Sequence, residues 1–205
     1  MKSALLRRRM SWLGPFSCVV LTLLLAAPST VPAATIYQTT LTGANEVPPN
    51  GSTAIGSATV TLNGNTLTVD ESFTGLIGGP AAAAHIHCCV PAGTNTGVAV
   101  PFTGFPAATS GTYSHSFDLT DPATYTAAFE TANGGTAALA EAALIAGLNG
   151  GLAYANIHDA TFPGGEIRGQ LQLQRRVPGP PTAVLLLLGV TTLIAVVRRR
   201  AHPLL

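Results

Sequence analysis

Residues 58–73 read ATVTLNGNTLTVDESF, and this stretch decides the fold of the chain. On both sides of Asn63-Gly64, apolar residues alternate with threonines at the period of two that is typical of a strand with one buried face. Asn-Gly is a dipeptide that suits a two-residue turn between antiparallel strands. The stretch therefore predicts a β-hairpin whose strands cover residues 54–62 and 65–73.

Alternating runs of the same kind continue on either side of the hairpin, separated by turn residues about every 8–12 positions. The clearest run is 165–174, where Ile167 and Leu171 lie on one face and charged or amide side chains on the other. This spacing is typical of an all-β sandwich. Further strands are predicted over residues 36–41, 83–89, 97–102, 111–119 and 152–158.

Residues 122–148 depart from this pattern. Asp121 can cap a helix that has Pro122 at its first position. The sequence TAALAEAALIAGLNGG at 136–151 has the Ala and Leu content of a second helix, which Asn149 and the following glycines should end. The predicted fold class is therefore mainly β: an antiparallel β-sandwich with a short helical insertion before its last two strands.

Residues 1–34 have the organisation of a secretory signal peptide. A basic start is followed by an apolar run at 19–27 and then by small residues, with cleavage expected after Ala33 or Ala34. The apolar run is about half of the roughly 20 residues that a membrane span needs. We therefore expect a signal helix that is removed on export.

A second apolar segment closes the chain. Residues 182–197 carry no charge and would form a helix about 24 Å long, which is enough to cross a thin bilayer. Arg198, Arg199 and Arg200 follow, and such clusters stay on the cytoplasmic side. The tail of residues 175–205 is thus predicted to hold a transmembrane helix, with the domain of residues 35–174 outside.

This tail resembles the PEP-CTERM sorting tail of Gram-negative bacteria, in which a proline motif, an apolar helix and terminal arginines occur in this order. The resemblance implies processing by an exosortase, and a membrane-anchored stage before the protein reaches the cell surface or the exterior. The motif of that family reads Val-Pro-Glu-Pro, whereas this chain has Val177, Pro178, Gly179 and Pro180. Because the glutamate is missing, a plain single-span anchor in the inner membrane remains the alternative.

The charges of the chain are segregated, although its net charge is only +1. Between Thr35 and Gln174, one base, Arg168, faces nine acidic residues, so this segment carries a charge of −8. A segment so acidic repels a phosphate backbone, which excludes nucleic acid as a partner. Cations and neutral polymers, such as an exopolysaccharide or another matrix component, are the partners that fit.

The stretch AHIHCCV at 84–90 holds the side chains that could carry chemistry. His85 and His87 share one face of their predicted strand, because side chains alternate along a strand. His158 ends a second predicted strand and would join them if the two strand ends meet. Three such imidazoles suit copper or zinc. The alternative is that these histidines are hydrogen-bonded packing residues.

Three segments resemble, in order and spacing, the CHRD domain, which was first described as a repeat in chordin and also occurs singly in exported bacterial proteins. They are LTGANEVPP at 41–49, TGLIGGPAAAAHIH at 74–87 and AYANIHDATFPGGEIRGQL at 153–171. The resemblance implies no general biochemical activity. The histidine pattern is also similar to that of copper/zinc superoxide dismutase, another β-sandwich, and this implies copper binding by His85, His87 and His158. The full ligand set of that enzyme is not evident here.

Cys88 and Cys89 stand where the CHRD pattern usually has Gly and Pro, and Cys18 would leave with the signal peptide. The pair could form a strained vicinal disulfide, remain as free thiols, bond to another molecule or provide soft ligands for copper. Because side chains alternate along a strand, only Cys89 should share the face of His85 and His87. Cys89 is therefore a further candidate ligand.

Arg168 is expected to form a hydrogen-bonded salt bridge with Glu46, because both lie in segments that match the CHRD domain. Glu71 falls on the apolar face of the hairpin, together with Val69 and Phe73. It is either a second partner for Arg168 or a sign that its strand shifts register.

No Ser/His/Asp order, phosphate-binding loop or spaced pair of carboxylates stands out, so hydrolase and nucleotide-binding functions are not favoured. We expect a non-enzymatic protein, envelope-anchored or sorted by an exosortase, with a role in surface or extracellular-matrix interactions. The alternative is a copper- or zinc-binding domain with redox chemistry like that of superoxide dismutase.

Overall fold

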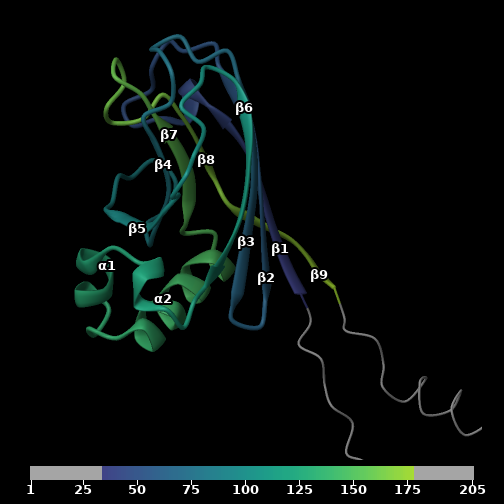
Figure 1. Ribbon diagram of the computed structural model, residues 1–205, viewed down its shortest axis with the longest axis vertical. Coiled ribbons are helices and arrows are strands. Elements are labelled where there is room, and N and C mark those ends of the chain that lie inside the picture. Colours follow the sequence, from purple (N-terminus) through teal and green to yellow (C-terminus); the bar gives the residue numbers. More distant parts are fainter. Residues whose placement is uncertain (1–33, 178–205) are drawn as a thin grey trace, which may run out of the picture.

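A computed structural model describes residues 34–177, with side chains up to residue 174 (Figure 1). The predicted signal peptide and most of the predicted sorting tail, including the transmembrane helix over 182–197, lie outside the described residues. Within residues 34–177, no helix is long and apolar enough to span a membrane.

The described part of the chain is mainly β. Its strands are β1 (Ala34–Thr42), β2 (Ile55–Asn63), β3 (Thr66–Thr74), β4 (Ala83–His87), β5 (Val98–Pro101), β6 (Gly111–Asp118), β7 (Tyr154–His158), β8 (Ile167–Gln170) and β9 (Gln172–Val177). The hairpin predicted from Asn63-Gly64 is confirmed as β2 and β3, which pair antiparallel from Ile55↔Thr74 to Asn63↔Thr66. Gly64 has a φ of 56°, a conformation that glycine adopts without strain.

The strands form one antiparallel sheet in the order β5-β4-β7-β8-β1-β2-β3-β6, with β9 also paired to β1. This sheet curls so that β4, β5 and β7 lie beside the long strands β1, β2, β3 and β6 (Figure 1). The expected mainly β, antiparallel fold is confirmed, and its two facing layers are the halves of a single curled sheet (Figure 1). The halves stay joined because β1 pairs with β8 at Thr42↔Arg168 and with β9 along its first residues.

The strand predicted over 165–174 is split into two strands, β8 and β9, because its two halves pair with different neighbours. β8 pairs mainly with β7 and meets β1 only at Thr42↔Arg168, whereas β9 pairs with β1 alone, so the chain changes its main partner at Leu171. Leu171 is fully buried, and its backbone N–H donates to the Ala153 carbonyl at 2.9 Å. The helical insertion consequently precedes three strands and not two.

Alternating apolar side chains from both halves of the sheet meet in one core. Most of them come from the strands, and α2 adds more. The largest fully buried apolar side chains are Tyr37, Leu41, Val60, Leu67, Ile86, Leu119, Leu144, Leu148, Ile157, Ile167 and Leu171. Burial of such side chains is the main term that stabilises a fold of this size.

The insertion contains a 3-10 turn (Pro122–Thr124) and two helices, α1 (Ala127–Ala132) and α2 (Ala137–Asn149), gathered at one end of the sheet (Figure 1). The second predicted helix is confirmed as α2. The first was placed too early, because Asp121 caps only the 3-10 turn and α1 is capped by Thr126. Leu144 and Leu148 bury the inner face of α2 in the core.

Glu71 lies on the buried face of β3, as its position in the alternation indicated. The pairing of β3 with β2 and β6 runs without a shift of register, and neither carboxyl oxygen of Glu71 has a hydrogen-bond partner. Both interpretations of Glu71, a register shift and a partner for Arg168, are therefore wrong. Burial raises the pKa of this carboxyl from 4.5 to about 8.

Candidate metal centre

The three histidines come together because β4 and β7 are neighbours in the sheet. The antiparallel register pairs Ala83 with His158, His85 with Asn156 and His87 with Tyr154. Residues that face each other across two strands point to the same side of the sheet, so all three imidazoles lie on one face. The histidines thus meet by direct strand pairing and not only at strand ends.

The other face of these strands carries the apolar residues Ile86, Ala155 and Ile157, which belong to the core. The histidine face also holds Tyr154, Asn156 and, one strand further along, Arg168 opposite Asn156. Tyr154, Asn156 and Arg168 are buried even though they point away from the core. Loops therefore cover this face of the sheet, and the polar side chains beneath them are shielded from solvent.

One ring nitrogen of each histidine lies within 4.8 Å of a ring nitrogen of the other two. The ring centroids are 5.0 Å apart for His85 and His158, 5.6 Å for His85 and His87, and 5.9 Å for His87 and His158. Bonds of 2.0–2.1 Å to zinc place two ligand nitrogens at most about 4.2 Å apart. In a tetrahedral site two ligand nitrogens lie only about 3.4 Å apart, so the widest of these nitrogen separations would have to shorten by roughly 1.4 Å around an ion.

Backbone carbonyls define which nitrogen of two rings is free. His87 Nδ1 lies 2.9 Å from the Thr96 carbonyl oxygen, and His158 Nδ1 lies 3.1 Å from that of Pro163. A carbonyl only accepts, so each Nδ1 carries the proton and each Nε2 keeps its lone pair. This is the arrangement in which a second hydrogen bond orients a histidine toward a metal.

Each of the three rings retains one buried nitrogen that has no hydrogen-bond partner: Nδ1 of His85 and Nε2 of both His87 and His158. Packing histidines normally have both nitrogens satisfied, because an unpaired buried polar atom costs about 1–3 kcal/mol. Three such atoms in one cluster fit a metal ion, which would accept all three lone pairs. The donor set suits copper or zinc, and three protein ligands leave a position open.

Burial lowers the pKa of His85 and of His87 to about 4, and repulsion from His158 acts in the same direction. Burial also lowers the pKa of His158, against the opposing effect of its hydrogen bond to Pro163. The three imidazoles are consequently neutral at pH 7, and only the neutral ring can bind a metal through its free nitrogen.

Tyr154 packs against His87, one of the three candidate ligands. Its ring stacks on His87 with a centroid distance of 4.6 Å and an interplanar angle of 3°. The guanidinium of Arg168 lies 4.3 Å from the centroid of the same tyrosine ring, which is cation–π geometry. The orientation of His87 is therefore linked to Arg168 through one aromatic ring.

The direct salt bridge expected between Glu46 and Arg168 is not formed, although both side chains are buried. Arg168 donates to Asn95 Oδ1 at 2.7 Å and to the Thr94 carbonyl at 3.3 Å, whereas Glu46 Oε1 accepts from Asn156 Nδ2 at 2.6 Å. The charges still interact: burial raises the pKa of Glu46 to about 7, and the positive charge of Arg168 opposes this rise. The loop containing Thr94 and Asn95 therefore supplies the hydrogen-bond acceptors that Glu46 was expected to supply to Arg168.

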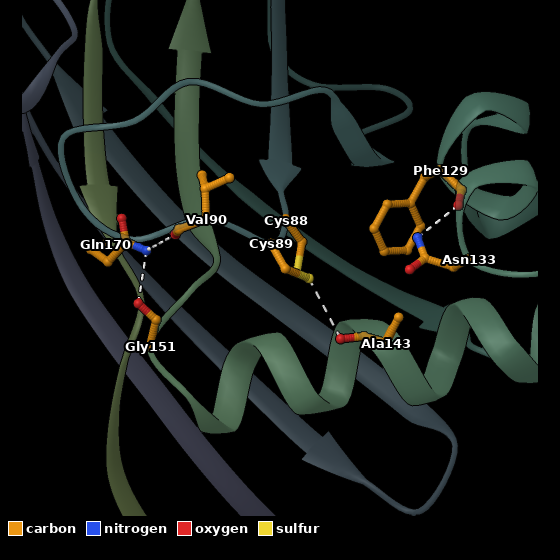
Figure 2. Close-up of a disulfide and its surroundings, with 8 residues drawn as sticks. All are labelled: Cys88, Cys89, Val90, Phe129, Asn133, Ala143, Gly151 and Gln170. Atoms are coloured by element: carbon orange, nitrogen blue, oxygen red, sulfur yellow. Dashed lines mark hydrogen bonds between the residues drawn. A yellow bond between two sulfur atoms is a disulfide. The ribbon is translucent and has the colours of Figure 1, made fainter.

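Cys88 and Cys89 form a disulfide with each other (Figure 2). β4 ends at His87, so the alternation that would place Cys89 beside His85 and His87 does not extend to it. The sulfur atoms lie against α2, and among the described residues the candidate metal ligands that come together are His85, His87 and His158. The structure does not bring Cys89 into this group.

Sequence reasoning missed Tyr154, Asn156 and the two carbonyls that orient His87 and His158. The side chains could have been found, because Tyr154, Asn156 and His158 alternate along one strand and must share a face. The Thr96 and Pro163 carbonyls leave no trace in the sequence, since every residue has one.

The fold and site define a class: a mainly antiparallel β protein with a three-histidine candidate metal centre on the polar face of its curled sheet. A family model described as the CHRD domain matches residues 37–171, so the chain belongs to the CHRD-domain family. No curated protein and no solved structure matches the chain.

Proposed function

We propose that this chain is an exported CHRD-domain protein that binds one copper or zinc ion through His85, His87 and His158. The observation that carries the proposal is the set of three buried ring nitrogens without hydrogen-bond partners, all on one face of β4 and β7. Two of these rings are held by backbone carbonyls in the tautomer that a metal requires.

A binding role is favoured over dismutation of superoxide. The domain carries nine acidic residues, so its field repels an anionic substrate. Its single base, Arg168, is buried and already donates to Asn95 and Thr94, so it is not free to guide an anion to the centre. These features support a non-enzymatic protein whose partners are cations or neutral matrix polymers such as an exopolysaccharide.

The metal proposal is tested by titrating the purified full chain, in a mild detergent, with zinc and separately with copper. We expect one ion per chain. Replacing His158 by Ala should weaken binding more than about 100-fold, because loss of an orienting group alone costs 10–100-fold. Isothermal titration calorimetry or competition with a chromophoric chelator measures the affinity.

His115→Ala is the matched control, because His115 is an exposed histidine on β6 and lies outside the cluster. This variant should bind zinc as the wild type does. Equal affinities for wild type and His158→Ala would overturn the proposal, as would binding lost equally in both variants.

The export proposal rests on the sequence of the two ends. We expect a chain truncated from Val177 onward to be released from the membrane fraction, because it lacks the apolar segment 182–197. Gly179→Glu, which restores the Val-Pro-Glu-Pro motif, should increase exosortase cleavage. Fractionation followed by immunoblotting measures both, and a truncated chain that remains membrane-bound would refute the role of the tail.

A further inference from the structure

The Cys88–Cys89 disulfide lies between the strand that carries His85 and His87 and the helix α2 (Figure 2). Cys88 is buried, whereas Cys89 is exposed to solvent. Both sulfur atoms press on the backbone of α2 at Gly147, where an added Cβ would collide with each of them. Cys89 Sγ also lies 3.5 Å from the Ala143 carbonyl oxygen. The disulfide is thus tightly packed between β4 and α2.

The same pair begins the loop that orients the metal centre. This loop, residues 88–97, contains the Thr96 carbonyl that accepts from His87 Nδ1. Its Asn95 side chain and Thr94 carbonyl accept from Arg168. The start of the loop is held by Val90, whose carbonyl accepts from Gln170 Nε2 at 3.2 Å (Figure 2). Cys88 directly follows His87, so movement at the disulfide also reaches His87 through the chain itself.

A cavity of about 330 Å³ gives access to this region. Both cysteines line it, together with Thr96, Gly97 and residues of α1 that include Phe129. A small thiol compound that enters the cavity therefore lies beside both cysteines and beside Thr96.

We propose that the Cys88–Cys89 disulfide is a redox-active site, reduced by a small dithiol, and that its reduction weakens metal binding by His85, His87 and His158. The proposal rests on the proposed function, since it needs a metal at this centre. It assigns a role to the cysteine pair that the metal proposal leaves without one.

The reduction is a thiol–disulfide exchange. One thiolate of the dithiol attacks Sγ of the exposed Cys89, a mixed disulfide forms, and Cys88 leaves as a thiolate that takes up a proton. The second thiol of the reagent, after losing its proton, displaces Cys89, which is protonated in turn. The protein disulfide gains two electrons and two protons, and the dithiol becomes a disulfide.

Reduction weakens the centre because two thiols need more space than one disulfide. The sulfur atoms are no longer bonded and must move apart, while Gly147 blocks movement toward α2. Cys89 can turn into solvent, and the start of the 88–97 loop then shifts with it. The Thr96 carbonyl then no longer accepts from His87 Nδ1. The loss of such an orienting carbonyl costs about 10–100-fold in metal affinity.

The test compares zinc affinity of the full chain in its oxidised and reduced forms, with Cys18 replaced by Ser so that only this pair reacts. Zinc is the probe because it does not oxidise thiols. Dithiothreitol is added and then removed by gel filtration under nitrogen, and free thiols are counted before the titration. We expect thiols to rise from none to two per chain and zinc affinity to fall about 10-fold or more.

The double variant Cys88→Ser/Cys89→Ser is the matched control, because it cannot form the disulfide. It should bind zinc as weakly as the reduced chain and should not respond to dithiothreitol. By linkage, zinc should slow or disfavour reduction of the wild-type disulfide, and this readout does not depend on the variant folding correctly.

Three results would overturn the proposal: a disulfide that resists dithiothreitol, equal zinc affinities of the two forms, or tighter binding after reduction. The last result would indicate that the thiolates themselves bind the ion. If the oxidised wild type and His158→Ala both fail to bind zinc, the proposed metal function fails first, and the thiol count shows separately whether the disulfide is reducible.

Discussion

Replacing Arg168 by Ala is expected to lower the free energy of unfolding by about 3–5 kcal/mol, because it removes two hydrogen bonds made by a charged group, each of which contributes about 1.5–3 kcal/mol. Arg168 is 2 % exposed and donates hydrogen bonds to Asn95 and Thr94. Its guanidinium also packs on the ring of Tyr154. The substitution therefore leaves a cavity and unpaired acceptors in the polar interior of the sheet. Urea unfolding followed by circular dichroism measures the loss.

Two further variants separate the contributions to this loss. Arg168→Lys keeps the charge but lacks the planar fork that reaches two acceptors, so it should restore only part of the stability. Gln172→Ala, an exposed position on β9, should change stability by less than about 0.5 kcal/mol. A loss in Arg168→Ala no larger than that of Gln172→Ala would show that the network does not stabilise the fold.

Replacing Glu71 by Gln is expected to make the protein more stable at alkaline pH and to leave it almost unchanged near pH 4.5. Burial raises the pKa of the Glu71 carboxyl to about 8 in the fold, against 4.5 in the unfolded chain. Between these two values the native state holds a proton that the unfolded state has released. Stability therefore falls as pH rises through this window, by about 1.4 kcal/mol for each pH unit.

Over the whole window the difference between wild type and Glu71→Gln should reach the order of 5 kcal/mol. Tyr113, which faces Glu71 across β3 and β6, stays neutral throughout because burial raises its pKa to about 12. Urea unfolding at a series of pH values measures the two curves.

Asp70→Asn provides the control for this experiment, since Asp70 precedes Glu71 on the same strand but is exposed on the opposite face. Its stability should follow the wild-type pH dependence. If the free energy of unfolding changed with pH in the same way for wild type and Glu71→Gln, the Glu71 carboxyl would be ionised in the folded protein and would contact an ion-pair partner or solvent.

Most strands were predictable because local alternation determines which face of a strand is buried. Residues 58–73 define both the β2–β3 hairpin and its turn, and the Ala-rich run 136–151 defines α2. The start of α1 was misplaced because Asp121 and Pro122 begin a 3-10 turn equally well. The break at Leu171 was missed because alternation does not indicate which neighbour a strand pairs with.

The candidate site was predictable only in part. His85 and His87 share a face by alternation alone, and His158 was a candidate because it ends a second predicted strand. The position of Cys89 was misjudged because β4 ends one residue before the cysteine pair. The salt bridge of Arg168 was assigned to Glu46 because the sequence has few charges to choose from, whereas the structure uses neutral oxygens of Thr94 and Asn95.

The sequence by itself determined the β class of this protein, its hairpin, its second helix and the face that His85 and His87 share, because each depends on residues close together in the chain. Only the tertiary structure decided that β4 lies beside β7, so that His158 joins the pair, and that the 88–97 loop orients His87. These contacts join residues far apart in the chain. Burial of the common core selects them, and a local pattern does not encode that choice.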